Sequence, residues 1–443
     1  MASANVINND QYCLMTATNP QVPVKALLRV PKLWLMPTLL STLLTVVLSL
    51  VYMGGVVNPM GNLDRLPIAV VNADQGQPLP GQQQNLGTQI TQSLTAGTSH
   101  AVDWRVLTQA QAQDQMDSGK VYGELSIPAD FTNSVAALVT NTATARPTLT
   151  VLTNPGTGSL GSSFAQTIST QAAQQASMTL GSQLAAAAGP DADAAAKLLL
   201  ADPVHITIQP GHPLGQHSGL GLTAFYYALV IVMMSFLAAN VIQSGVDSGL
   251  GYADTEIGPW HRRRPTVPIN RTRTLLLKMA MTAALTAVTV TLLMVSTIGI
   301  LGIDASHLPL LWIFSYCAAL AVALGALAIY AAFGGIGQLV AMVVFVVMGL
   351  PSSGLTIPLQ AVPGFYRFLS RFEPMHQLAG GVRSILYFDA RGDAGLTHAW
   401  IMIAIGLILA LVFGFAMTRY YDRKGLRRLV PQPAPPATPD VQS

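Results

Sequence analysis

The chain has 443 residues, of which 51% are hydrophobic and only 10% are charged. Ordinary soluble domains carry roughly 25% charged residues, so this composition indicates a protein embedded in lipid. The formal net charge of +3 is dispersed along the chain, and we expect no nucleic-acid partner. Cys13 lies in a polar tail and Cys317 in an apolar run, which excludes a disulfide framework.

Six apolar runs are long enough to cross a membrane. A hydrocarbon core about 30 Å thick needs roughly 20 apolar residues in a helix, and none of the runs contains Asp, Glu, Lys or Arg. The predicted spans are residues 33–57, 219–243, 279–303, 308–333, 335–357 and 399–418. The first run is too long for the core of a signal peptide, so we interpret it as an uncleaved anchor. Gly334 separates the fourth and fifth runs and predicts a tight hairpin.

The Lys and Arg residues between these runs predict the orientation. Segments 1–32, 244–278 and 419–443 hold 3, 6 and 5 of the 23 basic residues, whereas the much longer segment 58–218 holds 5 and segment 358–398 holds 4. Cytoplasmic segments of membrane proteins are enriched in Lys and Arg. We therefore expect a plasma (inner) membrane protein of a bacterial-type cell with both termini in the cytoplasm. The polar N-terminal tail and the proline-rich C-terminal tail are predicted to be disordered.

Residues 58–218 form the predicted extracytoplasmic domain. Stretches rich in β-formers alternate there with helical stretches, which is typical of a mixed α/β domain. The predicted strands are residues 67–71, 102–107, 121–127, 148–152 and 204–208, and the predicted helices are residues 82–94, 108–117, 129–139 and 158–200. Small residues dominate positions 156–188, which suits either a closely packed helix or a flexible stalk. Asn72 and Asp74 are expected to cap a turn after the first strand. The predicted fold class is an α-helical polytopic membrane protein with this α/β domain inserted between its first two spans.

The segment 358–398 is predicted to lie outside and to contain two short amphipathic helices. Apolar residues recur there at helical spacing behind Pro363 and Pro374. Charged and aromatic residues among them are candidates for an outer gate or interface: Phe365, Arg367, Arg371, Glu373 and Arg383. Anchoring at the lipid headgroups is the plainer interpretation of the same arginines.

Motifs of catalysis are absent from the sequence. No Lys is followed by Ser or Thr, so the phosphate-binding loop of common ATPases cannot form, and neither a zinc helix nor a nucleophile elbow occurs. We therefore expect no enzymatic activity, cofactor or metal. His205, His212 and His217 are interpreted as exposed loop residues rather than metal ligands. Because the six runs also lack the ionisable groups of ion-coupled carriers, any transport is expected to draw its energy from another polypeptide.

Four local matches point to one family. They are LPIAVVNADQG at residues 66–76, GKVYGELSIP at 119–128, the stretch 251–259 with the arginines after it, and PSSG at 351–354 with the GGVRSILY stretch that begins at Gly380. One span, a large outside domain and five further spans complete the pattern. Together these features resemble the type-2 ABC exporter permeases, and especially the phage-infection protein (Pip) family and its actinobacterial relatives.

The resemblance implies a permease-like fold that works as a dimer and meets a separate cytoplasmic ATPase. The ATPase contact is expected in the Arg-rich loop, where binding of anionic membrane lipid is the alternative role for the same residues: Arg262, Arg263, Arg264, Arg271 and Arg273. The expected function is export of a hydrophobic or cell-envelope compound, energised by that ATPase. The alternative is a non-transporting envelope scaffold or phage-receptor-like protein that binds envelope proteins through its outer domain.

Overall fold

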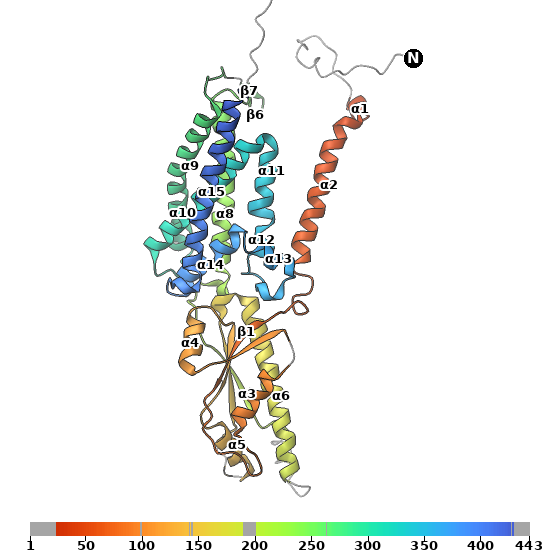
Figure 1. Cartoon of the computed structure of the whole chain (residues 1–443), viewed down its shortest axis with the longest axis vertical. Coiled ribbons are helices and arrows are strands. Elements are labelled where there is room, and N and C mark those ends of the chain that lie inside the picture. Colours follow the sequence, from red (N-terminus) through yellow and green to blue (C-terminus); the bar gives the residue numbers. More distant parts are fainter. Residues whose placement is uncertain are drawn as a thin grey trace, which may run out of the picture. The chain divides into compact units, whose positions relative to one another are not determined.

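The computed structural model describes residues 24–97, 100–140, 142, 145–188, 201–262, 264–426 and 428. The chain divides into two compact units, Met1–Met53 and Gly54–Ser443. The described part of the first unit contains the short helix α1 (Val24–Leu27) and almost all of the long apolar helix α2 (Pro31–Gly54), in which no residue is buried (Figure 1). The tails predicted to be disordered and Cys13 lie outside the described residues.

A five-stranded sheet forms the centre of the inserted domain. The strands are β1 (Leu66–Asn72), β2 (Val102–Val106), β3 (Gly123–Ile127), β4 (Thr148–Thr153) and β5 (His205–Pro210), and their order in the sheet is β2-β1-β3-β4-β5. β1 is parallel to β2 and β3, β4 is antiparallel to β3, and β5 is parallel to β4. All five strands were predicted from the sequence, and each agrees to within two residues at either end.

Helices cover both faces of this sheet. The helices are α3 (Leu86–Thr95), α4 (Gln109–Asp117), α5 (Phe131–Val139) and α6 (Ser159–Ala188). On one face, Leu125 and Val151 pack in a cluster with residues of α3, α5 and α6, and on the other face Ala69 and Val71 pack with Met116 of α4. This α/β arrangement follows from strands that are apolar on both sides.

The small-residue stretch is a helix and not a stalk as far as Ala188. Because α6 carries small side chains, it approaches the sheet closely, and a Cβ added at Gly123 would lie 3.2 Å from the Cβ of Ala165. The predicted continuation of this helix to residue 200 falls outside the described residues beyond 188.

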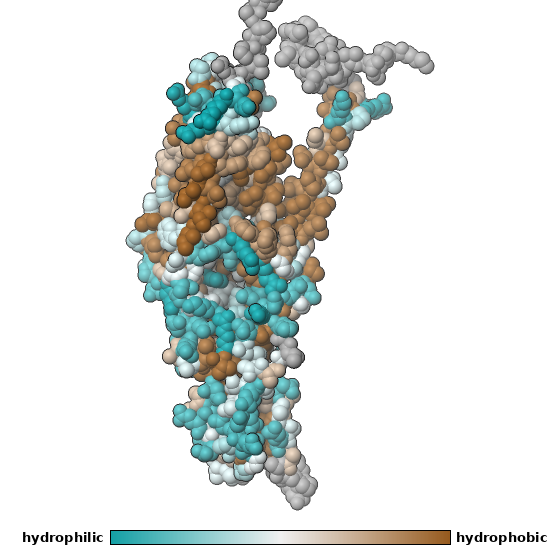
Figure 2. Space-filling view, in the orientation of Figure 1, coloured by the Kyte–Doolittle hydropathy of each residue, from teal (hydrophilic) through white to brown (hydrophobic). Residues whose placement is uncertain are grey.

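Five helices in the described part of the chain are long and apolar enough to span a membrane. Besides α2 they are α8 (Thr223–Gly249), α9 (Arg271–Met294) with a π-helical extension η4 (Val295–Ile300), α10 (Leu308–Phe333) with the segment that follows it to Ser352, and α15 (Leu396–Arg423). Figure 2 shows apolar residues gathered over the middle of the bundle and hydrophilic residues over the sheet domain. The protein is therefore a polytopic membrane protein with an inserted α/β domain.

The chain reverses its direction at Gly334. This residue has a φ of +63° and is followed by η5 (Gly334–Ile336), α11 (Gly337–Met342), the π-helical η6 (Val343–Val347) and α12 (Gly349–Ser352). A Cβ at Gly325 of α10 would lie 2.9 Å from the ring of Phe345, which is possible only if the second segment runs back along the first. The predicted hairpin is confirmed, and glycine suits it because other residues rarely adopt positive φ.

Two predicted boundaries at the same end of the bundle as Gly334 were wrong. The expected loop 244–278 is shorter, because α8 continues to Gly249 and α9 already begins at Arg271; a small hairpin of β6 (Thr255–Ile257) and β7 (Trp260–Arg262) lies between them. The expected C-terminal tail from residue 419 is helical as far as Arg423.

The two predicted outer helices are present. They are α13 (Gly364–Leu369) and α14 (Pro374–Tyr387), and α14 buries Leu378, Val382 and Ile385 in the core of the bundle. Short 3-10 turns connect the elements around them: η2 (Pro155–Thr157), η3 (Gly219–Gly221), η7 (Leu359–Ala361) and η8 (Gly392–Ala394).

Candidate functional site

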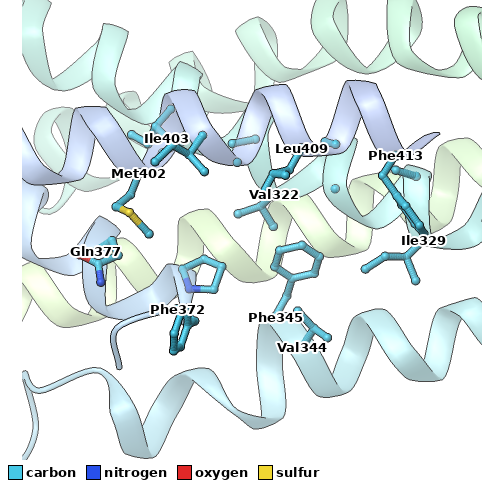
Figure 3. A pocket seen from close by; sticks show the side chains of 18 of the residues that line it. Val322, Ile329, Val344, Phe345, Phe372, Gln377, Met402, Ile403, Leu409 and Phe413 are labelled. Atoms are coloured by element: carbon cyan, nitrogen blue, oxygen red, sulfur yellow. The ribbon is translucent and has the colours of Figure 1, made fainter. Parts of the chain in front are cut away.

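A cavity of about 570 Å³ lies within the bundle, between α10, α15, the returning segment after Gly334 and the start of α14. Figure 3 shows Gln377 and Phe372 at one end of it and Phe413 and Ile329 at the other. The cavity therefore extends along the membrane-spanning helices from the α14 end of the bundle towards the end where α10 meets Gly334.

Small side chains create the space. On α10, lining positions Ala321, Gly325 and Ala328 recur every three or four residues and so share one face of the helix. On α15, Gly406 faces this side, and a Cβ added there would meet only the Cβ of Ala321, at 3.9 Å. Phe345 packs over Gly325 and forms the opposite wall.

Among the described residues, the lining carries no ionisable side chain. Its one polar side chain is the amide of Gln377, whose nitrogen donates a hydrogen bond to the carbonyl of Ser370 at 2.9 Å. A site of this kind favours an alkyl or other apolar group, because burial of apolar surface contributes about 25 cal/mol per Å². It offers no nucleophile, acid or base for catalysis. Sequence reasoning missed the cavity because its residues come from four segments and look like ordinary span residues.

The residues predicted as an outer gate are dispersed. Phe365 is exposed on α13, Arg367 forms an ion pair with Asp64, and Arg371 is exposed. Two residues of the set are instead structural. Glu373 is buried at the N-terminus of α14, where its carboxylate accepts hydrogen bonds from the amides of Met375 and His376 at 2.8 and 2.9 Å.

Arg383 is the member of the predicted set that contacts the sheet domain. One terminal nitrogen of its guanidinium donates a hydrogen bond to the carbonyl of Thr157 at 3.0 Å, while its buried Nε has no partner among the described residues. Arg383 thus belongs to the contact between α14 and the domain rather than to a gate.

Phe388 is the centre of that contact. Its ring is 1% exposed, and a Cβ at Gly119 or Gly156 of the sheet domain would lie 2.8 or 3.0 Å from it. The ring of His212 packs against it with centroids 5.2 Å apart. Because Gly119 and Gly156 have no side chains, the aromatic ring fits between the domain and the end of α14. We call this contact the joint, defined by Gly119, Gly156, His212 and Phe388.

Polar bonds surround the joint. The interpretation of His212 as an exposed loop residue was wrong, because its two ring nitrogens bond to a carboxylate oxygen of Asp117 at 2.9 Å and to the carbonyl of Tyr387 at 2.8 Å. Beside it, Lys120 pairs with Asp393 at 2.6 Å. The domain is therefore tied by several bonds to α14, the helix that also forms one end of the apolar cavity.

A buried charge cluster lies at the opposite end of the bundle. Asp247 of α8 accepts a hydrogen bond from Lys278 of α9 at 2.6 Å, and its two oxygens receive both terminal nitrogens of Arg428 at 2.7 Å. Lys278 is only 4% exposed and also donates to Gln243 at 2.8 Å. The sequence placed Asp247 and Lys278 in a loop, so this cluster was not predicted.

The predicted arginine contacts lie around this end of the bundle but do not form one patch. Arg262 is exposed on β7, Arg264 borders an open groove along α8, and Arg273 is exposed on α9. Arg271 instead packs over the ring of Tyr421, 5.3 Å from its centroid. Arg263 lies outside the described residues.

Two carboxylates of the sheet domain are buried. The oxygens of Asp74 accept hydrogen bonds from the amides of Gly76, Gly87 and Thr132, so the turn predicted after β1 is confirmed. Glu124 on β3 is 1% exposed, and neither of its oxygens has a hydrogen-bond partner among the described residues. Burial raises the pKa of Glu124 to about 7, and the nearby Ser126 hydroxyl acts in the opposite direction.

Comparisons with known proteins give a family without an assigned activity. No curated protein and no solved structure matches the chain. One family model, described as "Protein of unknown function (DUF3533)", matches residues 30–406. The match begins just before α2 and ends within α15, so it includes the sheet domain, the joint and all but the last part of the apolar cavity. The chain therefore belongs to the DUF3533 family.

Proposed function

We propose that this chain is the membrane-spanning component of an exporter that moves a hydrophobic or cell-envelope compound, and that a separate ATPase energises it. The observation that carries this proposal is the charge-free cavity of about 570 Å³ among helices that are apolar enough to span a membrane. A cavity without an ionisable side chain suits an apolar cargo and offers no group for ion coupling.

The occupant is the alkyl chain of a lipid-like compound. The lining is almost entirely aliphatic and aromatic and extends along the helices, so it matches a long apolar chain better than a compact polar solute. Gln377, the one polar lining residue, lies at the end of the cavity beside α14. We place the polar end of the cargo there, at the first turn of α14.

The direct test is photolabelling of the purified full-length protein with a diazirine-bearing fatty acid. We expect labelled peptides from α10 and α15 at the cavity. A Cβ at Gly406 has room, so Gly406→Leu places a side chain in the cavity and is expected to reduce this labelling. Ala404→Leu, on the exposed side of the same helix, is expected to leave the labelling unchanged. Equal labelling of both variants, or labelling confined to the outer surface, would contradict the proposal.

The separate ATPase requires its own experiment. Affinity purification from native membranes in a mild detergent is expected to recover an ATPase with this chain, together with a second copy of the chain if the component is a dimer. Repeated recovery without any ATPase, in preparations that keep other membrane complexes intact, argues against an energised exporter even where the cavity binds an alkyl chain.

The proposed topology has six passes in the plasma (inner) membrane, with both termini cytoplasmic. Its support is the chain reversal at Gly334, which divides the longest candidate span in two, and the excess of basic residues in the segments assigned to the cytoplasm. Reporter fusions after residue 264 and after residue 390 are expected to report opposite sides of the membrane.

A second candidate function is a scaffold or receptor that binds an envelope partner. The observation in its favour is that β5 is an edge strand whose His205 and Gln209 are exposed, and open sheet edges can pair with a further strand. Substitution of Ile208 by Pro in this strand is expected to abolish partner capture without changing fatty-acid labelling if the scaffold function applies. If the exporter function applies, the cavity-filling variant Gly406→Leu is expected to lose fatty-acid labelling while partner capture stays intact.

A further inference from the structure

A small cavity of about 60 Å³ lies at the end of the bundle farthest from the sheet domain. Residues of α8, α9, α10 and α15 line it, and Arg428, beyond the end of α15, completes it. This cavity is separate from the apolar one. About 10 to 15 Å³ is enough for one water molecule, so the space suits a few waters or one group of the size of phosphate.

The cavity has an excess of positive charge. Three cationic side chains line it: Arg271, Lys278 and Arg428. They meet two carboxylates, Asp247 bonded to Lys278 and Arg428, and Asp422 bonded to the backbone amide of Arg271 at 3.0 Å. The arrangement leaves one positive charge unbalanced at the cavity, which favours an anion there.

Two hydrogen-bond donors at the cavity are unused. The Nε of Arg271 donates to the carbonyl of Leu426 at 2.8 Å, but its terminal nitrogens have no hydrogen-bond partner among the described residues. Tyr330 is 2% exposed and lines the cavity, and its hydroxyl likewise has no partner there. Buried polar groups are almost always satisfied, so the Tyr330 hydroxyl indicates a missing acceptor. The guanidinium of Arg271 is partly exposed, and its terminal nitrogens are available to the same acceptor.

We propose that this cavity binds a phosphate group, held by the guanidinium of Arg271, the ammonium of Lys278 and the hydroxyl of Tyr330. Guanidinium and ammonium groups form charge-assisted hydrogen bonds to phosphate oxygens, and the tyrosine supplies a neutral donor. The cavity lies where four apolar helices end, which is the level of phospholipid headgroups. An anionic lipid headgroup and a free phosphate share the recognised chemistry.

The test uses the purified full-length protein and two probes. Native mass spectrometry after exchange into phosphatidylglycerol or phosphatidylcholine measures retained lipid, and calorimetric titration with inorganic phosphate measures the free ion. Preferential retention of phosphatidylglycerol supports a headgroup site, and saturable binding of inorganic phosphate supports a free-phosphate site. Either result is expected to weaken about tenfold in Arg271→Gln and severalfold in Tyr330→Phe.

The controls separate a built site from general attraction to a basic surface. Arg273→Gln removes the same charge two residues away on an exposed position of α9 and is expected to leave binding unchanged. Tyr330→Phe removes only the hydroxyl, so it tests the site even if Arg271→Gln folds poorly. Equal retention of both lipids with no phosphate binding overturns the proposal, and so does a loss in Arg273→Gln as large as that in Arg271→Gln.

Discussion

Asp247 and Arg428 form a two-point ion pair although they are 181 positions apart, with both nitrogen-to-oxygen distances at 2.7 Å. The pair fastens the segment after α15 to the end of α8. Because Lys278 bonds to the same carboxylate, one aspartate holds cations from two other parts of the chain. Its removal therefore has a larger consequence than removal of either cation.

We expect Asp247→Asn to lower the free energy of unfolding by about 3 kcal/mol, because it leaves the buried Lys278 without a carboxylate. Arg428→Gln is expected to cost less, since the Lys278 pair survives and Arg428 is partly exposed. Thermal unfolding of the full chain in detergent measures both. Lys424→Gln, an exposed charge near the same end, serves as the control, and a wild-type melting temperature in Asp247→Asn would show that the cluster is not stabilising.

The same cluster shows where prediction from sequence reached its limit. The predicted spans were defined as apolar runs without charged residues, so the second span ended before Asp247 and the third began after Lys278. Taken alone, each of these two charged residues looks as if it belongs to a loop. Their pairing across 31 positions lets both lie inside helices. His212 was misjudged for the same reason, since its partners Asp117 and Tyr387 are 95 and 175 positions away.

Local patterns, in contrast, were reliable. β1 was predicted from an unbroken apolar run, and the hairpin at Gly334 from a glycine between two apolar runs, because both depend on neighbouring residues. The apolar cavity depends on which faces of α10 and α15 meet, and one sequence does not contain that information.

Asp74 is expected to be essential to the stability of the sheet domain. Its carboxylate joins the turn after β1 to the first turn of α3 through Gly87 and to α5 through Thr132, so one side chain connects three segments. Asp74→Ala is expected to destabilise the domain by about 3 kcal/mol, as for the loss of buried charge-assisted hydrogen bonds. Limited proteolysis of the full chain measures the effect. Asp130→Ala removes an exposed carboxylate that bonds, among the described residues, only to the hydroxyl of Ser134, so this variant should remain as resistant as wild type.

Glu124 gives the sheet domain a pH-dependent stability. Its pKa in the folded protein is about 7, above the ordinary value of 4.5, so the folded state binds a proton that the unfolded chain has already released. Stability is therefore highest below pH 4.5 and falls as the pH rises to about 7, by about 3 kcal/mol in total. Glu124→Gln is expected to remove this dependence and to be more stable than wild type at pH 8.

Hydrogen exchange of the β3 peptide between pH 5 and pH 8, corrected for the intrinsic exchange rate, is the appropriate measurement. A local readout is needed because burial also raises the pKa of Glu373 to about 7, and that residue lies in α14 rather than in the sheet. Glu124→Gln should flatten the profile of β3 and leave that of α14 unchanged. A pH profile of β3 that persists in the variant would assign the effect to another group.

Phe388 is expected to couple the sheet domain to the bundle. The ring is buried between Gly119, Gly156 and His212, and truncation of a buried phenylalanine costs about 3 to 5 kcal/mol. Because the loss falls on the joint, Phe388→Ala should increase hydrogen exchange in α4 and in the amides of η2 more than in the distant α9. Phe368→Ala, which removes the same ring from an exposed position of α13, is the matched control. If the proposed exporter needs a fixed joint, Phe388→Ala also impairs export while fatty-acid labelling of the cavity persists. Unchanged hydrogen exchange at α4 would instead mean that the hydrogen bonds and ion pairs of His212 and Lys120 are enough to hold the domain in place.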